Sequence, residues 1–98
     1  MAEWLDPVTP GEILRDEFMA EYGLSQNKLA LALQVPVSII NRIINNKQRI
    51  SAEVALRLAR YFGTDPQSWM NLKTNYDLRI AERATAEKIA QQVKPIDA

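Results

Sequence analysis

Five helix start signals divide this sequence into short segments. Thr9, Ser25, Ser51 and Asp65 are residue types that cap helix N-termini, and Pro36 fixes a backbone angle that suits the start of a helix. No stretch alternates apolar and polar residues for long enough to indicate a strand. The sequence therefore predicts an all-α fold of about five helices.

Each segment carries apolar residues three or four positions apart, which is the spacing of a buried helix face. These faces consist of Ile13, Leu14 and Phe18, then Leu29, Ala30 and Leu33, then Val54, Ala55, Leu58 and Phe62, then Trp69, Leu72, Tyr76 and Ile80. The last segment covers about residues 66–93, and Thr85 within it is a candidate cap for a final short helix. Because no repeat or linker interrupts the chain, we expect one domain over residues 1–98 with a C-terminal helical extension.

The composition argues against several classes of function. The chain has 98 residues, of which 47% are apolar and 24% charged, and it contains no cysteine and no histidine. Without cysteine the chain can form no disulfide and has no thiolate nucleophile. Without histidine it lacks the commonest general base, and without both it lacks the usual ligands of transition metals. We expect neither an enzyme nor a metal or cofactor site. No run approaches the roughly 18 apolar residues of a membrane span, so we expect a soluble, cytoplasmic protein.

The net charge of zero hides a polarity along the chain. Residues 1–22 carry six acidic residues and one basic residue, whereas residues 23–64 carry six basic residues and one acidic residue. A basic middle segment is the place where a polyanion would bind, although surface charge clusters are often only solvated faces.

The segment after Pro36 sorts its side chains onto two faces when it is wound as a helix at about 100° per residue. Ile39 lies on the border between an apolar and a polar face. The apolar face holds Val37, Ile40, Ile43 and Ile44, and the polar face holds Ser38, Asn41, Arg42 and Asn45. The segment is therefore an amphipathic helix with a polar side available for contacts.

A short helix, a tight turn and this amphipathic helix have the lengths of a helix-turn-helix unit over about residues 25–45. In such units the second helix lies in the DNA major groove. Asparagine matches adenine, arginine matches guanine and an aliphatic group meets the thymine methyl, and these types occur at Asn41, Arg42 and Ile39. The pattern favours recognition of double-stranded DNA.

Cations flank the amphipathic helix. Lys47 and Arg49 follow it in a loop, and Lys28 lies in the preceding helix, where each can bind a phosphate. Two short helices around a turn also occur in bundles that bind no DNA. A purely structural or protein-binding helical domain therefore stays open as an alternative.

Several sequence blocks carry a resemblance to a known family. The run LALALQVPVSIINRI, followed by NNKQRIS, resembles the helix-turn-helix of the phage-repressor-like XRE class. The blocks PGEILRDEF, LSQNKLALAL, ISAEVALRLARYFGTDPQSWMNL and NYDLRIAE are similar to the HigA family of antitoxins. Together they extend from Pro10 to about Glu82, in the same order and spacing.

This resemblance implies a five-helix, lambda-repressor-like DNA-binding domain that forms a homodimer on a palindromic operator, represses its own operon and neutralises a HigB toxin of the RelE type, which cleaves mRNA. It implies that Gln26 contacts phosphate and that bases are read by the start of the second helix and the turn after it. With the residues argued above, the expected DNA-binding set is Gln26, Lys28, Val37, Ser38, Ile39, Asn41, Arg42, Asn45, Lys47 and Arg49. A stand-alone XRE-type transcriptional regulator without a toxin partner is the nearest alternative.

Two positions depart from the XRE pattern. Gln34 stands where the class usually has the glycine of the turn, and Asn46 stands where glycine usually ends the recognition helix. Asparagine tolerates a left-handed backbone, whereas a glutamine predicts some strain or a different turn.

Two further surfaces are candidates for protein contacts. The stripe of Trp69, Tyr76 and Ile80 is a candidate dimer interface, with core packing as the alternative, and Trp4 and Leu5 are candidates for packing on a neighbouring subunit or on this domain. The acidic residues Asp16, Glu17 and Glu21 are candidates for binding a basic toxin, with a solvated helix face as the alternative.

Overall fold

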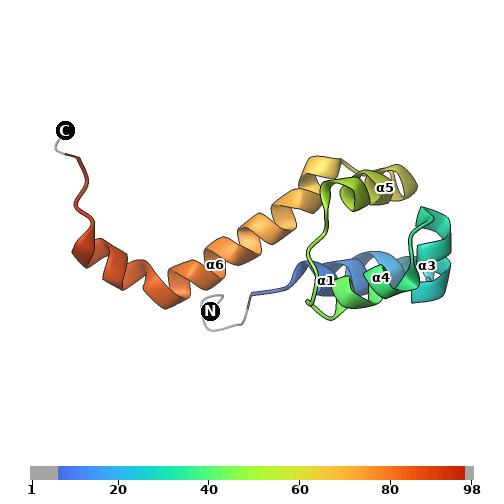
Figure 1. The fold of residues 1–98 in the computed structure, drawn as a ribbon, viewed down its shortest axis with the longest axis horizontal. Coiled ribbons are helices and arrows are strands. Elements are labelled where there is room, and N and C mark those ends of the chain that lie inside the picture. Colours follow the sequence, from blue (N-terminus) through green and yellow to red (C-terminus); the bar gives the residue numbers. More distant parts are fainter. Residues whose placement is uncertain (1–6, 97–98) are drawn as a thin grey trace.

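The computed structural model describes residues 7–96, and every regular element in that range is a helix (Figure 1). In chain order the elements are α1 (Pro10–Ile13), the π-helical segment η2 (Leu14–Met19), α2 (Ala20–Tyr22), α3 (Gln26–Leu33), α4 (Val37–Ile44), α5 (Ala52–Phe62) and α6 (Pro66–Gln92). The first three elements follow one another without a break and form one helix. The predicted all-α class with five helices is confirmed for the described residues.

The predicted helix start signals act as expected. The side chains of four residues accept hydrogen bonds from the backbone N–H three positions on, and they are Thr9, Ser25, Ser51 and Asp65. Pro36 is extended and precedes the first residue of α4. Gly23 and Gly63 end their helices with φ angles of 63° and 70°, which glycine adopts without strain. Local chemistry therefore sets the helix boundaries.

The first helix contains a π-helical segment that the sequence pattern did not predict. The N–H of Ala20 bonds the carbonyl of Arg15, five residues back. In an α-helix, Leu14 and Met19 would point about 140° apart, because successive residues are separated by about 100°. Both are buried here. The wider turn brings the two side chains toward one core, a placement that 3.6-residue periodicity cannot reveal.

The C-terminal helix is continuous through Thr85, so the expected cap at that position was wrong. α6 runs from Pro66 to Gln92, and the Thr85 hydroxyl donates to the carbonyl of Ala81 at 2.7 Å. A threonine inside a helix can satisfy its hydroxyl in this way without ending the helix.

One hydrophobic core joins all five helices. Its buried members are Leu14, Met19, Leu29, Ala30, Leu33, Ile40, Ile43, Ile44, Ile50, Val54, Ala55, Leu58, Ala59 and Trp69. Phe18 and Phe62 pack beside it, with ring centroids 5.1 Å apart. This cluster fixes the orientation of the short helices, none of which is long enough to be stable alone.

Trp69 belongs to this core, which corrects its assignment to a dimer interface. Only 2% of its surface is exposed, and its indole N–H donates to the Thr64 hydroxyl at 2.7 Å. Its ring lies 4.7 Å from that of Phe18. No surface is left for a partner to cover. Trp4 and Leu5, the other aromatic and aliphatic candidates, lie outside the described residues.

α6 leaves the body of the protein after its first turns (Figure 1). Tyr76 is half-buried, but from 77 to 96 every described residue except Thr85 is exposed. The radius of gyration is 16.6 Å, compared with about 13 Å for a compact chain of this length. We call residues 77–96 the arm. No helix in residues 7–96 is long and apolar enough to cross a membrane.

The start of the first helix lies directly against the end of α4. A Cβ atom on Gly11 would overlap the carbonyl oxygen of Ile43, and it would lie 2.7 Å from that of Ile44. Both contacts are with backbone, which cannot move aside as a flexible side chain can. Only glycine therefore allows α1 to approach α4 this closely.

We predict that Gly11→Ala lowers the free energy of unfolding by about 1–3 kcal/mol, because the added methyl group forces α1 and α4 apart. Urea unfolding followed by circular dichroism measures this. Gly23→Ala is the matched control, since a Cβ there meets nothing within 4 Å and the cost is backbone strain alone. A Gly11→Ala protein as stable as the wild type would contradict the close packing.

Candidate nucleic-acid interface

α4 presents a polar face because its apolar face is held in the core. Ile40, Ile43 and Ile44 are 0%, 1% and 7% exposed, whereas Asn41 and Arg42 are exposed. The buried isoleucines leave the helix no freedom to rotate about its axis. The opposite face is thereby fixed toward solvent.

At the start of α4 the predicted polar residue Ser38 and the predicted apolar residue Val37 both reach solvent, because the core does not extend to the first turn. Ser38 is exposed and Val37 is 42% exposed. Ile39, expected at the border between the two faces, is half-buried and packs partly against the core. Part of its side chain is therefore available to a ligand at the entrance of the helix.

The turn between α3 and α4 is tight and uses a left-handed glutamine. Gln34 has a φ of 58°, and its N–H bonds the carbonyl of Leu31 while the N–H of Val35 bonds that of Ala30. Asn46 has the same φ of 58° after α4. Gln34 and Asn46 therefore adopt the left-handed backbone conformation that glycine would adopt at the same positions. For Gln34 this conformation costs some strain.

A side-chain contact joins the two helices on their outer side. The Asn41 amide nitrogen donates to Gln26 Oε1 at 3.2 Å. This leaves the Asn41 side chain one N–H and its oxygen, which are the donor and acceptor that adenine N7 and N6 require. Gln26 thus braces Asn41, and the structure brings together two residues that lie 15 positions apart in sequence.

A second contact joins Arg42 to the loop after α4. The Arg42 Nε donates to Gln48 Oε1 at 2.8 Å. Sequence spacing does not reveal this contact, because it depends on how the loop folds back. Asn45 is also engaged, since its side-chain nitrogen donates to the carbonyl of Asn41 at 2.9 Å. One side-chain N–H and the side-chain oxygen of Asn45 remain available to bind another group.

Three residues expected to contact phosphates have no acidic partner among residues 7–96. Lys28, Lys47 and Arg49 are exposed, and the ion pairs found among residues 7–96 involve other cations. A cleft of about 260 Å³ lies beside the loop and is also lined by Lys73 and Tyr76 of α6. Unpaired cations beside a polar helix face make a surface suited to a polyanion.

Tyr76, expected at a dimer contact, faces this loop from α6. Its hydroxyl accepts a hydrogen bond from the Asn46 side-chain nitrogen at 3.5 Å, which is a long contact. Ile80, one turn further along, is 43% exposed and makes part of the arm. The three residues of the predicted dimer stripe therefore differ in their contacts. Trp69 packs in the core, Tyr76 contacts the loop after α4, and Ile80 is exposed to solvent.

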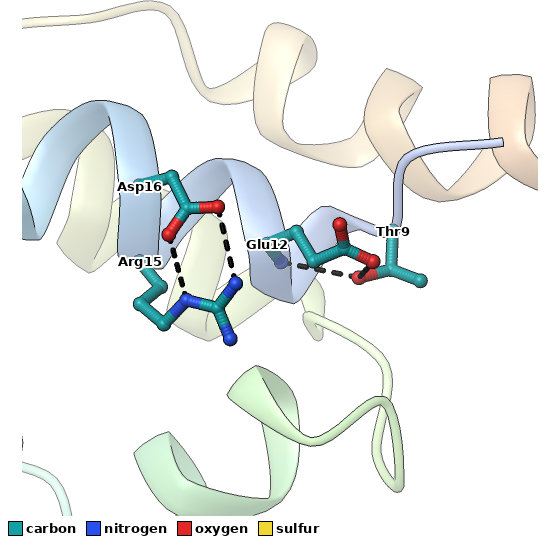
Figure 2. A network of polar contacts seen from close by, with 4 residues as sticks. All are labelled: Thr9, Glu12, Arg15 and Asp16. Carbon is teal, nitrogen blue, oxygen red and sulfur yellow. Dashed lines mark hydrogen bonds and ion pairs between the residues drawn. The ribbon is translucent and has the colours of Figure 1, made fainter. Parts of the chain in front are cut away.

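The acidic residues of the first helix are exposed, but one of them is already paired. Arg15 donates to Asp16 through Nε at 2.7 Å and Nη2 at 3.1 Å (Figure 2). These bonds lower the pKa of Asp16 below its ordinary value. Glu17 and Glu21 have no ion pair with another described residue. They are the acids on this helix that can meet a basic partner.

Thr9 and Glu12, the remaining polar pair of this helix, have a structural role. The Thr9 hydroxyl accepts a hydrogen bond from the Glu12 N–H at 3.1 Å, and it donates one to Glu12 Oε1 at 3.3 Å (Figure 2). Among the residues that the structure describes, no three histidine, cysteine or acidic side chains are placed to hold a metal ion.

Known proteins share this architecture. The helix-turn-helix family profile matches residues 15–69. Virulence-associated protein I of Dichelobacter nodosus is 53% identical over 76 residues, which are 78% of this chain and 70% of that protein. Antitoxin HigA-1 of Vibrio cholerae is 33% identical over 90 residues, which are 92% of this chain and 84% of that one.

The solved structure of the Pseudomonas aeruginosa antitoxin HigA with the higBA promoter is similar over nearly the whole fold. Its TM-score is 0.84 at 44% identity, covering 93% of this chain and 99% of that one. This chain belongs to the HigA family of helix-turn-helix antitoxins. The HigA match covers more of the chain than the helix-turn-helix profile, which ends at residue 69 near the start of α6. Much of α6 is therefore part of the HigA fold and is not an unrelated addition.

Proposed function

We propose that this HigA-family protein is a sequence-specific DNA-binding antitoxin of a type II toxin-antitoxin module. It binds a palindromic operator as a homodimer, represses its own operon and neutralises a HigB toxin of the mRNA-cleaving RelE type in the cytoplasm. The observation that carries the proposal is the fixed polar face of α4 beside unpaired cations. The similarity to a HigA structure containing promoter DNA supports it.

In this proposal α4 lies in the major groove and reads base edges. Asn41 is braced by Gln26 and offers a donor and an acceptor to adenine. Arg42 offers its terminal nitrogens to guanine, and the exposed part of Val37 or Ile39 meets a thymine methyl. Lys28, Lys47 and Arg49 bind phosphates on either side and set the register of the helix.

We predict that Asn41→Ala and Arg42→Ala each weaken operator binding by about 1–3 kcal/mol per half-site, because each removes a base contact. A mobility-shift assay with the DNA upstream of the protein's own gene measures this. Asn71→Ala and Arg60→Ala are matched controls, since both residues are exposed and lie on α6 and α5. Absence of binding by the wild-type protein would reject the DNA-binding proposal.

A dimer supplies the two recognition helices that a palindrome requires, about 34 Å apart on one face of DNA. The arm is the surface that we assign to the partner subunit. Its larger apolar side chains are 43–92% exposed, and they are Leu78, Ile80, Ile89, Val93 and Ile96. A second copy of the arm packed against it would cover these side chains.

We predict that Ile80→Asp weakens dimerisation by about tenfold or more, since a charge replaces a buried apolar contact in the dimer. Sedimentation velocity over a concentration series measures the monomer fraction. Thr74→Asp, at an exposed position of α6 before the arm, is the control. If Ile80→Asp and the wild type dimerise equally, the arm is not the interface.

Glu17 and Glu21 form the surface that we assign to the toxin. A protein that binds RNA is expected to be basic, and two unpaired carboxylates four residues apart attract such a surface. Asp16 contributes less than the two glutamates, because its carboxylate already pairs with Arg15. This surface lies on the first helix, and the recognition face lies on α4, so toxin and DNA can bind separate regions.

We predict that the double charge reversal Glu17→Lys with Glu21→Lys weakens the toxin complex and leaves operator binding unchanged. Co-expression with the product of the neighbouring gene, followed by affinity measurement, tests the first part. The control for a change in net charge is Glu53→Lys with Asn71→Lys and Thr74→Lys, because these exposed positions lie outside the first helix and the arm and together change the charge by the same amount. Unchanged toxin affinity would reject this surface, and failure of any neighbouring gene product to co-purify would favour a stand-alone XRE-type regulator.

A further inference from the structure

We propose that Gln48 is a positioning residue that aims Arg42 at a guanine, so that each operator half-site contains a guanine facing the second turn of α4. The inference rests on the proposed DNA binding and deepens it. It assigns a role to a side chain outside the recognition helix, and it names the base that the helix reads at that position.

The geometry of the contact determines which atoms of Arg42 remain available. Arg42 Nε donates to Gln48 Oε1 at 2.8 Å. The Arg42 side chain makes no second hydrogen bond to residues 7–96. Because a guanidinium group is planar, one bond at Nε restrains the plane of the whole group. The two terminal nitrogens stay free, and they form the fork that fits O6 and N7 of guanine.

Gln48 is itself held in place by the fold of the loop. Asn46 is left-handed with a φ of 58°, and the N–H of Lys47 bonds the carbonyl of Arg42 at 2.8 Å. Gln48 is half-buried and lines the cleft beside Gly11 and Ile43. Two residues further on, the loop is anchored by a buried isoleucine, Ile50, at 2% exposure. The acceptor is therefore presented by a restrained segment.

A neutral acceptor suits this role better than a carboxylate. Glutamine accepts the hydrogen bond from Nε and leaves the positive charge of Arg42 uncompensated, which favours approach to DNA. An acidic residue would neutralise Arg42 and repel the phosphates. Residues 22–52 contain no acidic residue, which fits this requirement. Restraining a long side chain before binding also lowers the entropy lost when it contacts the base.

The test is selection of binding sites from a random double-stranded DNA library with four proteins, which are the wild type, Gln48→Met, Arg42→Ala and the double variant. Methionine has a similar length to glutamine but no amide oxygen to accept the bond. Gln67→Met is the matched control, because that glutamine bonds Asn71 on α6. Thermal unfolding verifies that each variant is folded.

We expect the wild type to select a guanine in each half-site. Gln48→Met should weaken that preference by about three- to tenfold and leave the other positions unchanged, since only one side chain loses its restraint. Arg42→Ala should abolish the preference, and adding Gln48→Met to it should change nothing further. That lack of additivity is the signature of a residue that acts through Arg42.

Different failures separate this inference from the proposed function. If the wild type selects no sequence, DNA recognition itself is rejected. If the wild type selects a site but Gln48→Met retains full guanine preference, or lowers binding to all sequences equally, Gln48 does not position Arg42. An equal loss on all sequences would identify it as a phosphate contact. An effect of Gln48→Met that persists in the Arg42→Ala protein would also overturn the inference.

Discussion

Burial of the isoleucine stripe of α4 is the constraint on which the rest of the structure depends. Ile40 and Ile43 are almost completely removed from solvent, and each such side chain contributes about 1.5–3 kcal/mol to folding. Gly11 allows the first helix to press against the end of the same helix. Because α4 can neither rotate nor shift, its polar face has a single direction, and base readout needs that fixed direction.

The contacts around α4 suggest how recognition is prepared before DNA is bound. Gln26 restrains Asn41 from one side, and Gln48 restrains Arg42 from the other. Tyr76 of α6 reaches the same loop through Asn46. The helix that carries the arm therefore passes beside the loop after α4 at Tyr76 and then continues to the part that we assign to the partner subunit. In this account, dimer geometry and base readout are connected through one helix.

Much of this architecture follows from the sequence because its causes are local. Caps such as Ser25 and Ser51, and the isoleucine spacing of α4, act within a few residues of themselves. The π-helical segment and the Gln48 contact depend on which segments meet in the folded chain, and neighbouring residues do not encode that. Tyr76 and Ile80 lie at helical spacing from Trp69, which predicts one shared face. The body of the protein ends after Tyr76, so Trp69 is buried, Tyr76 is half-buried and Ile80 is exposed.

In the proposed function, α4 of each subunit reads guanine in the major groove. Methylation interference tests it most directly, because dimethyl sulfate modifies guanine at N7 in the major groove and adenine at N3 in the minor groove. The account predicts that methylation of one guanine in each half-site blocks binding, at positions about 34 Å apart on one face of the DNA. Interference confined to adenine N3, or none within the protected site, would contradict it.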